Sequence, residues 1–198
     1  MCQRLIGNRA ASRLCLGMIF ALFVSSAAFS QEAISSQKDL GRALESAVMC
    51  KVDALGFFDG SEFAGGPGDA MHQLKSLGVD IAIKNEDYSG GIRYHFPPGV
   101  NVFGYEAIDA LYFSESTTLF VVTLRSDLKH LPRINRVLNL NPVPRGNPDG
   151  YGYVDNLDVR YVRKLPESGG DFPYTIFSGI KDGDGHRYIA VGCQNLAW

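Results

Sequence analysis

Few residues of this chain have the types and spacing that catalysis or metal binding requires. The four histidines, His72, His95, His130 and His186, do not show the His-x-x-x-His spacing of a metal site, and the sequence contains no Cys-x-x-Cys. We interpret each histidine as a surface or turn residue. We therefore expect neither a metal nor a cofactor.

Nucleophilic catalysis has equally little support in the sequence. The nucleophile-elbow pattern Gly-x-Ser-x-Gly is absent. Ser-x-x-Lys occurs twice, at Ser35/Lys38 and Ser126/Lys129, without the Ser-Asp-Asn or Lys-Thr-Gly partners that accompany it in serine acyl-enzymes. We assign no catalytic residue and predict that the protein is not an enzyme.

The acidic motif 182–185, Asp-Gly-Asp-Gly, has the form of the first positions of a calcium loop. Such a loop needs an acid at its twelfth position, and that position is Cys193. A tight hairpin turn explains the same residues. Close acidic pairs such as Asp59/Glu62 are common on an acidic protein and indicate no acid–base site.

The first thirty residues have the features of an export signal. Three arginines precede an apolar run and a stretch of small residues: Arg4, Arg9 and Arg13, then Leu14 to Val24, then Ser25 to Ser30. The run is shorter than the ~20 residues of a membrane helix. We predict cleavage after Ser30, or alternatively after Ala28, which removes Cys2 and Cys15. An uncleaved anchor is the competing interpretation, but no basic cluster follows the run.

Cleavage changes the charge of the protein. The whole chain has 19 Lys+Arg and 21 Asp+Glu, and residues 1–30 contain three arginines and no acid, which leaves 16 against 21, or −5. A nucleic-acid or anionic-membrane partner needs a basic surface. The charge therefore favours a neutral or basic protein as partner.

The two remaining cysteines, Cys50 and Cys193, predict one disulfide, since an exported protein folds in an oxidising compartment. This bond would close most of the domain, and a ~100-residue loop stabilises by about 4.7 kcal/mol in the chain-entropy model. Two free buried thiols are the alternative.

Helical patterns occupy the first part of the mature chain. Ser36 and Asp39 form an N-cap before an apolar stripe of period 3.6 that runs from Leu40 to Leu55. Cys50 lies at the small-residue flank of this stripe, where a strand could approach closely. A glycine-rich loop over 56–68 then leads to a short helix that begins after Asp69 and ends at Leu77.

Later segments follow the strand period of two. Leu119–Leu124 is apolar on both faces, which predicts a central strand. A short helix near Pro132, with Ile134, Val137 and Leu138 inward, interrupts the series. The predicted strands are Val79–Lys84, Ile92–Phe96, a short piece at Val100–Gly104, Ala107–Ser114, Thr118–Leu124, Leu157–Lys164, Tyr174–Ile180 and Arg187–Cys193.

Together these patterns predict a single α+β domain over residues 31–198. It contains a mostly antiparallel sheet of about six or seven strands, with the N-terminal helices packed on one face and one disulfide between Cys50 and Cys193. In the last strand, Ile189, Val191 and Cys193 share the inward face.

The longest irregular stretch, 139–153, is the predicted binding loop, because a rigid scaffold often presents functional side chains on such loops. Its candidate binding residues are Arg145, Asp149, Tyr151, Tyr153 and Asp155, since Tyr and Arg anchor protein interfaces. The alternative is that the tyrosines pack on the sheet edge.

By elimination, the sequence favours a small exported protein of the periplasm that binds or inhibits another protein. An immunity protein that neutralises a toxic effector enzyme is one such type, and no stable membrane anchor would remain after cleavage. The alternatives are a periplasmic hydrolase whose acids and histidine meet only in the fold, and a cell-envelope ligand-binding or adaptor module.

Overall fold

The computed structural model describes residues 34–60, 69–84, 91–114, 118–143, 156–166, 173–183 and 185–195. The predicted signal sequence lies outside these ranges, and so do residues 144–155, which include most of the predicted binding loop 139–153 and all five candidate binding residues. Within them, three N-terminal helices and a short later helix pack on a nine-stranded antiparallel sheet. No helix of these described residues is long and apolar enough to cross a membrane.

The first helix, α1 (Gln37–Val48), begins at the predicted cap. The Asp39 backbone N–H donates to the Ser36 hydroxyl, and this hydroxyl donates to the Asp39 carboxylate at 2.6 Å. The sequence pattern implied one helix along the whole apolar stripe, but the structure has two. Cys50 adopts a left-handed conformation (φ 59°) after α1, so the chain turns before α2 (Val52–Phe58) begins.

The third helix, α3 (Ala70–Ser76), confirms the second predicted helix. Asp69 caps it, since the carboxylate accepts a hydrogen bond from the His72 backbone N–H at 2.6 Å.

All neighbouring strands of the sheet are antiparallel. Their order is β1-β2-β4-β5-β9-β8-β7-β6, with β3 paired to β4 beside this path. Among the described residues the sheet has nine strands where six or seven were predicted: β3 lies in the predicted short piece Val100–Gly104, and β6 lies in the stretch predicted to be irregular. The strands are β1 (Asp80–Lys84), β2 (Gly91–His95), β3 (Asn101–Val102), β4 (Tyr105–Ser114), β5 (Thr118–Arg125), β6 (Asn141–Pro142), β7 (Leu157–Leu165), β8 (Tyr174–Gly183) and β9 (His186–Asn195).

The predicted central strand is confirmed, since β5 lies between β4 and β9 in the middle of the order. The hairpin between β8 and β9 is also where the sequence predicted it. Gly183 pairs with His186, so the turn has two residues, and Gly185 in this turn has a positive φ of 74°.

A turn of 3-10 helix, η1 (Leu128–His130), leads into α4 (Leu131–Leu138), whose first turn contains Pro132 as predicted. Val137 does not point inward, because its side chain is 59% exposed. The inward position belongs to Asn135, which accepts a hydrogen bond from the Ser178 hydroxyl of β8. The buried set Leu131, Ile134, Asn135 and Leu138 has helical spacing, and Val137 lies outside it.

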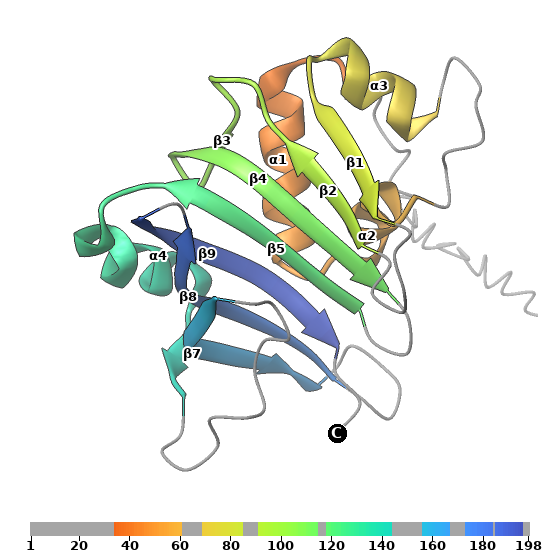
Figure 1. Cartoon of the computed structure of the whole chain (residues 1–198). Helices are drawn as coiled ribbons and strands as arrows, with labels where there is room; N and C mark the ends of the chain where they lie inside the picture. The colour runs from red at the N-terminus through yellow and green to blue at the C-terminus, as the bar shows by residue number, and fades with distance from the viewer. Residues whose placement is uncertain are drawn as a thin grey trace, which may run out of the picture. The chain divides into compact units, whose positions relative to one another are not determined.

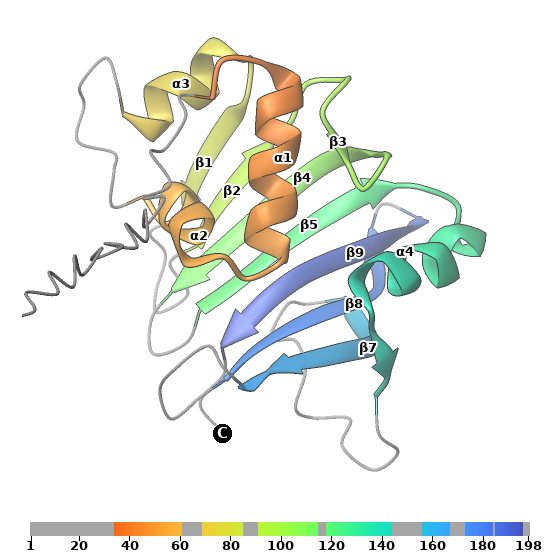
Figure 2. The same ribbon diagram turned by 180° about the vertical axis from the view of Figure 1, so that it is seen from behind.

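The helices lie on one face of the sheet. Figure 1 shows α1 and α4 behind the strands, and Figure 2, from the opposite side, shows them in front. The main core fills the space between these layers with inward residues of the helices and strands, among them Leu40, Leu44, Phe58, Leu74, Tyr94, Phe120, Val122, Ile134 and Ile189. This arrangement confirms the predicted fold class.

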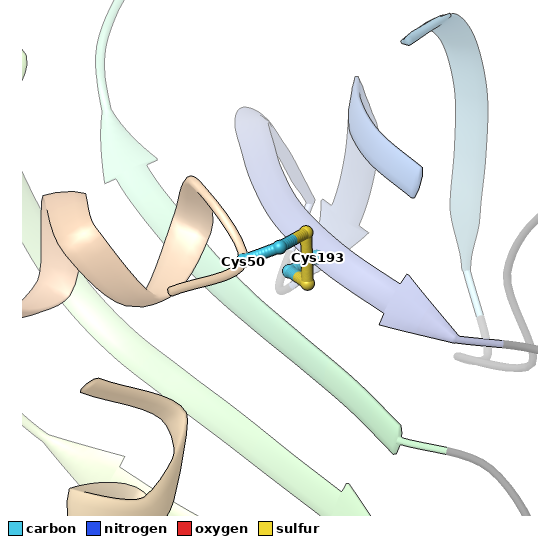
Figure 3. The surroundings of a disulfide bond; sticks show 2 residues. All are labelled: Cys50 and Cys193. Carbon is cyan, nitrogen blue, oxygen red and sulfur yellow. A yellow bond between two sulfur atoms is a disulfide. The ribbon is translucent and has the colours of Figure 1, made fainter. Parts of the chain in front are cut away.

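The disulfide between Cys50 and Cys193 is present and connects the α1–α2 junction with the inward face of β9 (Figure 3). The two Cα atoms are 5.3 Å apart, and both cysteines are buried. Ile189 and Val191 share the core with Cys193, as predicted for the last strand. The bond therefore fastens the helical layer to the middle of the sheet.

Candidate functional site

The sequence-predicted binding residues Arg145, Asp149, Tyr151, Tyr153 and Asp155 lie outside the described residues, so their role stays a prediction. The structure does describe the two ends of their loop. Val143 donates its backbone N–H to the Arg160 carbonyl at 2.9 Å, and both Val143 and Leu157 pack against a second apolar cluster.

This second cluster identifies the other face of the sheet, here called the open face because the helices of the described residues lie opposite to it. Neighbouring residues of a strand point to opposite faces, so Val121 of β5 and Ala190 of β9 face away from the helices. The cluster consists of Leu119, Val121, Val162, Phe177 and Ala190, all buried. The loop ends therefore emerge beside the open face.

A close-packed backbone accompanies this cluster. A Cβ atom built on Gly192 would overlap both the Phe120 carbonyl oxygen and the Phe177 ring. The Phe177 ring therefore occupies the space above Gly192, and this half of the open face is filled by apolar side chains.

A polar cluster of Asp109, Thr123 and Lys181 lies at the border of the apolar half. The Lys181 ammonium is 3.2 Å from the Asp109 carboxylate and donates to the Thr123 hydroxyl at 2.9 Å. The Thr123 hydroxyl donates to the same carboxylate oxygen at 2.6 Å. The Lys181 and Asp109 side chains are only 16% and 15% exposed. The Lys181 ammonium, the Thr123 hydroxyl and the Asp109 carboxylate are hydrogen-bonded to one another. The cluster is therefore a structural ion pair and not an activated nucleophile.

Sequence reasoning missed this cluster because of a β-bulge. The register between β4 and β5 shifts between Ala107 and Asp109, so the two residues face opposite sides of the sheet although they are two apart. Strict alternation from Ala107 would have placed Asp109 among the helices. The available signal was Thr123, a polar residue within the apolar strand β5.

The other half of the open face is formed by β1, β2 and β4 and is more accessible. Arg93 is paired in register with Ala82 on one side and Leu111 on the other, and His95 is paired with Asp80 and Asp109. Asp80, Ala82 and His95 are exposed, whereas Arg93, Leu111 and Phe113 are partly buried. We call these six residues the exposed half of the open face.

Among the described residues, Ser126 and His130 come nearest to a catalytic arrangement. The Ser126 hydroxyl is 3.0 Å from His130 Nδ1, and the His130 ring packs against Tyr105 with centroids 5.3 Å apart. In a serine triad the hydroxyl meets Nε2 while an acid holds Nδ1. The adjacent Asp127 instead caps η1, accepting from the Lys129 backbone N–H and pairing with its ammonium.

The resolved pKa shifts belong to structural groups. The Ser36 hydroxyl lowers the pKa of Asp39, and the Lys129 backbone N–H lowers that of Asp127. Burial raises the pKa of Tyr94 and also that of Tyr112.

Among the described residues, no three His, Cys, Asp or Glu side chains gather as metal ligands. His72 is exposed on α3, His95 is exposed on β2, and His186 is exposed at the start of β9 with its ring 6.3 Å from that of Tyr188.

Comparisons with known proteins give no relative: no family model matches the chain, and no curated protein or solved structure is similar to it.

Proposed function

We propose that this protein is an exported binding protein that recognises another protein through the open face of its sheet. One observation supports this proposal above others: the helices of the described residues cover one face, while the opposite face combines exposed His95 and partly buried Arg93 with the Lys181–Asp109 ion pair. An inhibitor of the immunity type, which neutralises a toxic effector enzyme, is the form of this function that the sequence favours.

The composition of the exposed half suits a protein partner. Arg and aromatic side chains contribute most to interface energies, and Arg93 stands beside Leu111 on the same face. The strands fix the backbone at these positions, so no backbone freedom is lost there on binding. The net charge of −5 after cleavage favours a neutral or basic partner, and the periplasm is the proposed location.

The predicted binding loop supports the same surface. Its two ends leave from Val143 and Asn156, and Val143 packs with the apolar cluster of the open face. The exposed half lies on β1, β2 and β4 at one edge of the sheet, and the ends of the loop lie at β6 and β7 at the other edge. We therefore propose that the partner covers the open face and contacts the exposed half at one edge of the sheet and this loop at the other.

The experiment is affinity capture with the exported protein as bait, first from periplasmic extract and then from competitor bacteria. Each captured protein is purified, and its stoichiometry and Kd are measured with the isolated pair. We expect one partner at fixed stoichiometry. The double variant R93A/H95A should weaken its binding by about tenfold or more, because loss of an Arg side chain from the core of an interface costs at least ~1.4 kcal/mol.

The matched control carries K38A/K75A on α1 and α3, which pack on the helical side of the sheet, and should bind as the wild type does. A further variant, in which Gly and Ser replace residues 145–153, measures the contribution of the loop to binding separately from that of the strands. If no protein binds stoichiometrically, or if neither open-face nor loop variant changes the Kd, the proposal is wrong.

A hydrolase is the second candidate, and the Ser126–His130 contact at 3.0 Å is the observation that favours it. Treatment with a fluorophosphonate ester, followed by intact mass, tests it directly. If the protein only binds a partner, no covalent adduct forms. An adduct that is lost in S126A would replace the binding proposal with an enzymatic one.

A further inference from the structure

A basic surface on η1 and α4 contrasts with the acidic character of the mature chain. Residues 125–138 contain four basic residues and one acid, a formal charge of +3, whereas residues 31–198 carry −5. We define the basic surface as Arg125, Lys129, Arg133, Arg136 and Val137.

The packing of α4 determines which side chains form this surface. Leu131, Ile134 and Leu138 are buried against the sheet, and the Asn135–Ser178 hydrogen bond holds the same side of the helix inward. Arg133, Arg136 and Val137 therefore point to solvent on one rigid helix. Figure 2 shows α4 on the helical side of the sheet, opposite the open face.

Two of the four basic residues already have partners. Arg125 pairs with Glu106 at 3.3 Å, and Lys129 pairs with Asp127 at 3.1 Å. Across the part of the chain that the structure describes, Arg133 and Arg136 form no ion pair. The helix dipole accounts for Arg136 in the last turn but not for Arg133.

Val137 adds an exposed apolar side chain beside these charges. It is one of three large apolar side chains that stand out as exposed among the described residues, at 59%, and it lies one turn from Arg133. Two guanidinium groups beside an exposed apolar side chain fit carboxylates that flank an apolar residue, since Arg binds carboxylates in a bidentate way.

We propose that this basic surface binds an acidic segment of a protein. An anionic membrane is less suited to it, because the surface offers a single apolar side chain for insertion. The surface lies across the sheet from the proposed open-face interface, so this inference does not rest on that function. The overall charge alone would have pointed to a neutral or basic partner only.

The test measures fluorescence anisotropy of a labelled Glu-rich peptide with one central Leu, titrated with protein expressed from the full-length sequence. We expect saturable binding that weakens as salt rises. R133E/R136E should weaken it at least about tenfold, and V137S should weaken it by a smaller factor. K38E/K75E makes the same change in net charge on α1 and α3 and should leave the Kd unchanged.

Circular dichroism first confirms that all variants fold, as expected for exposed positions. Three results would each overturn the inference: no saturable binding of the peptide, equal weakening by R133E/R136E and K38E/K75E, or tighter binding to phosphatidylglycerol vesicles than to the peptide. The first two would show that the surface is merely solvated or acts through net charge. The third would identify a membrane surface as its target.

Discussion

At the level of single residues, the Lys181–Asp109 pair is a strong constraint on the open face. Both side chains are mostly buried, and Thr123 bridges them. Removing one partner leaves the other charge without its counterion in a poorly hydrated place. Such a pair fixes the register of distant strands, since the two residues are 72 apart in the sequence.

We predict that D109A and K181A each lower the free energy of unfolding by about 2 to 3 kcal/mol, while the double variant costs clearly less than their sum. Urea unfolding of the four proteins of this double-mutant cycle measures the coupling. Strict additivity would show that the ion pair contributes nothing beyond two separate side chains.

Tyr94 makes stability sensitive to alkaline pH. Burial is the main cause that raises its pKa above the ordinary value of 10.0, and its hydroxyl donates to the Phe58 carbonyl at 2.6 Å. The unfolded chain loses this proton near pH 10 while the folded chain keeps it, so stability is complete below pH 10 and falls above it. One such group lowers the free energy of unfolding by about 1.4 kcal/mol per pH unit.

The variant Y94F should therefore be less stable at neutral pH, through loss of one buried hydrogen bond, yet lose less stability between about pH 10 and 11. Tyr112, whose pKa is also raised by burial, keeps part of the dependence. Urea unfolding across this range is the measurement. Parallel curves for Y94F and the wild type would contradict the assignment.

Individual residues were predictable where their role is local. Ser36 and Asp69 cap helices within three residues of their partners, so the motif contains the contact. Asp109 was not predictable, because a bulge reverses its face and its partner lies on another strand.

At the level of elements, the contact between α1 and β3 depends on one glycine. A Cβ atom on Gly41 would overlap the Asn101 carbonyl oxygen, and one turn later Glu45 accepts the Phe103 backbone N–H at 2.6 Å. The helix therefore rests directly on the backbone of the β3–β4 turn.

Substitution G41A should lower the free energy of unfolding by about 1 to 3 kcal/mol, because α1 must shift away from β3. Gly56 in α2 is the matched control, since nothing lies within 4 Å of a Cβ atom built there. There the same change should stabilise by about 0.5 to 1 kcal/mol through helix propensity. Thermal unfolding compares the two, and equal effects would refute the packing explanation.

Most elements could be predicted because their apolar period reports which face is buried. The predicted α3, β1, β2, β4, β5, β8 and β9 all occur close to their expected positions. The helical period of the apolar residues did not reveal that the helix ends before Cys50. A residue in the left-handed conformation leaves the spacing of these apolar residues unchanged. The period misplaced Val137 because Asn135, a polar residue, takes an inward position through a partner on β8.

For the whole molecule, the disulfide links the helical layer to the centre of the sheet across 143 residues of chain. C50A or C193A should lower the free energy of unfolding by about 3 to 5 kcal/mol, mainly by releasing the unfolded chain. The folded fraction should still bind its partner, since both cysteines lie on the helical side. Denaturation and binding are measured on the same samples, and a binding defect at unchanged stability would contradict this role.

The fold class could be predicted from the sequence, because it follows from the local periods of apolar residues and from the number of cysteines. The candidate site was not, because the exposed half joins Ala82, Arg93 and Leu111, which become neighbours only through strand pairing. The residues 144–155, where the sequence placed its binding candidates, lie outside the described structure.

The proposed interface on the open face is the central claim, and calorimetric titration of the captured partner tests it most directly. We expect binding at fixed stoichiometry, an affinity reduced at least about tenfold in R93A/H95A, and wild-type affinity in K38A/K75A. A Kd that is the same for all three proteins would show that the partner binds elsewhere and would contradict this account.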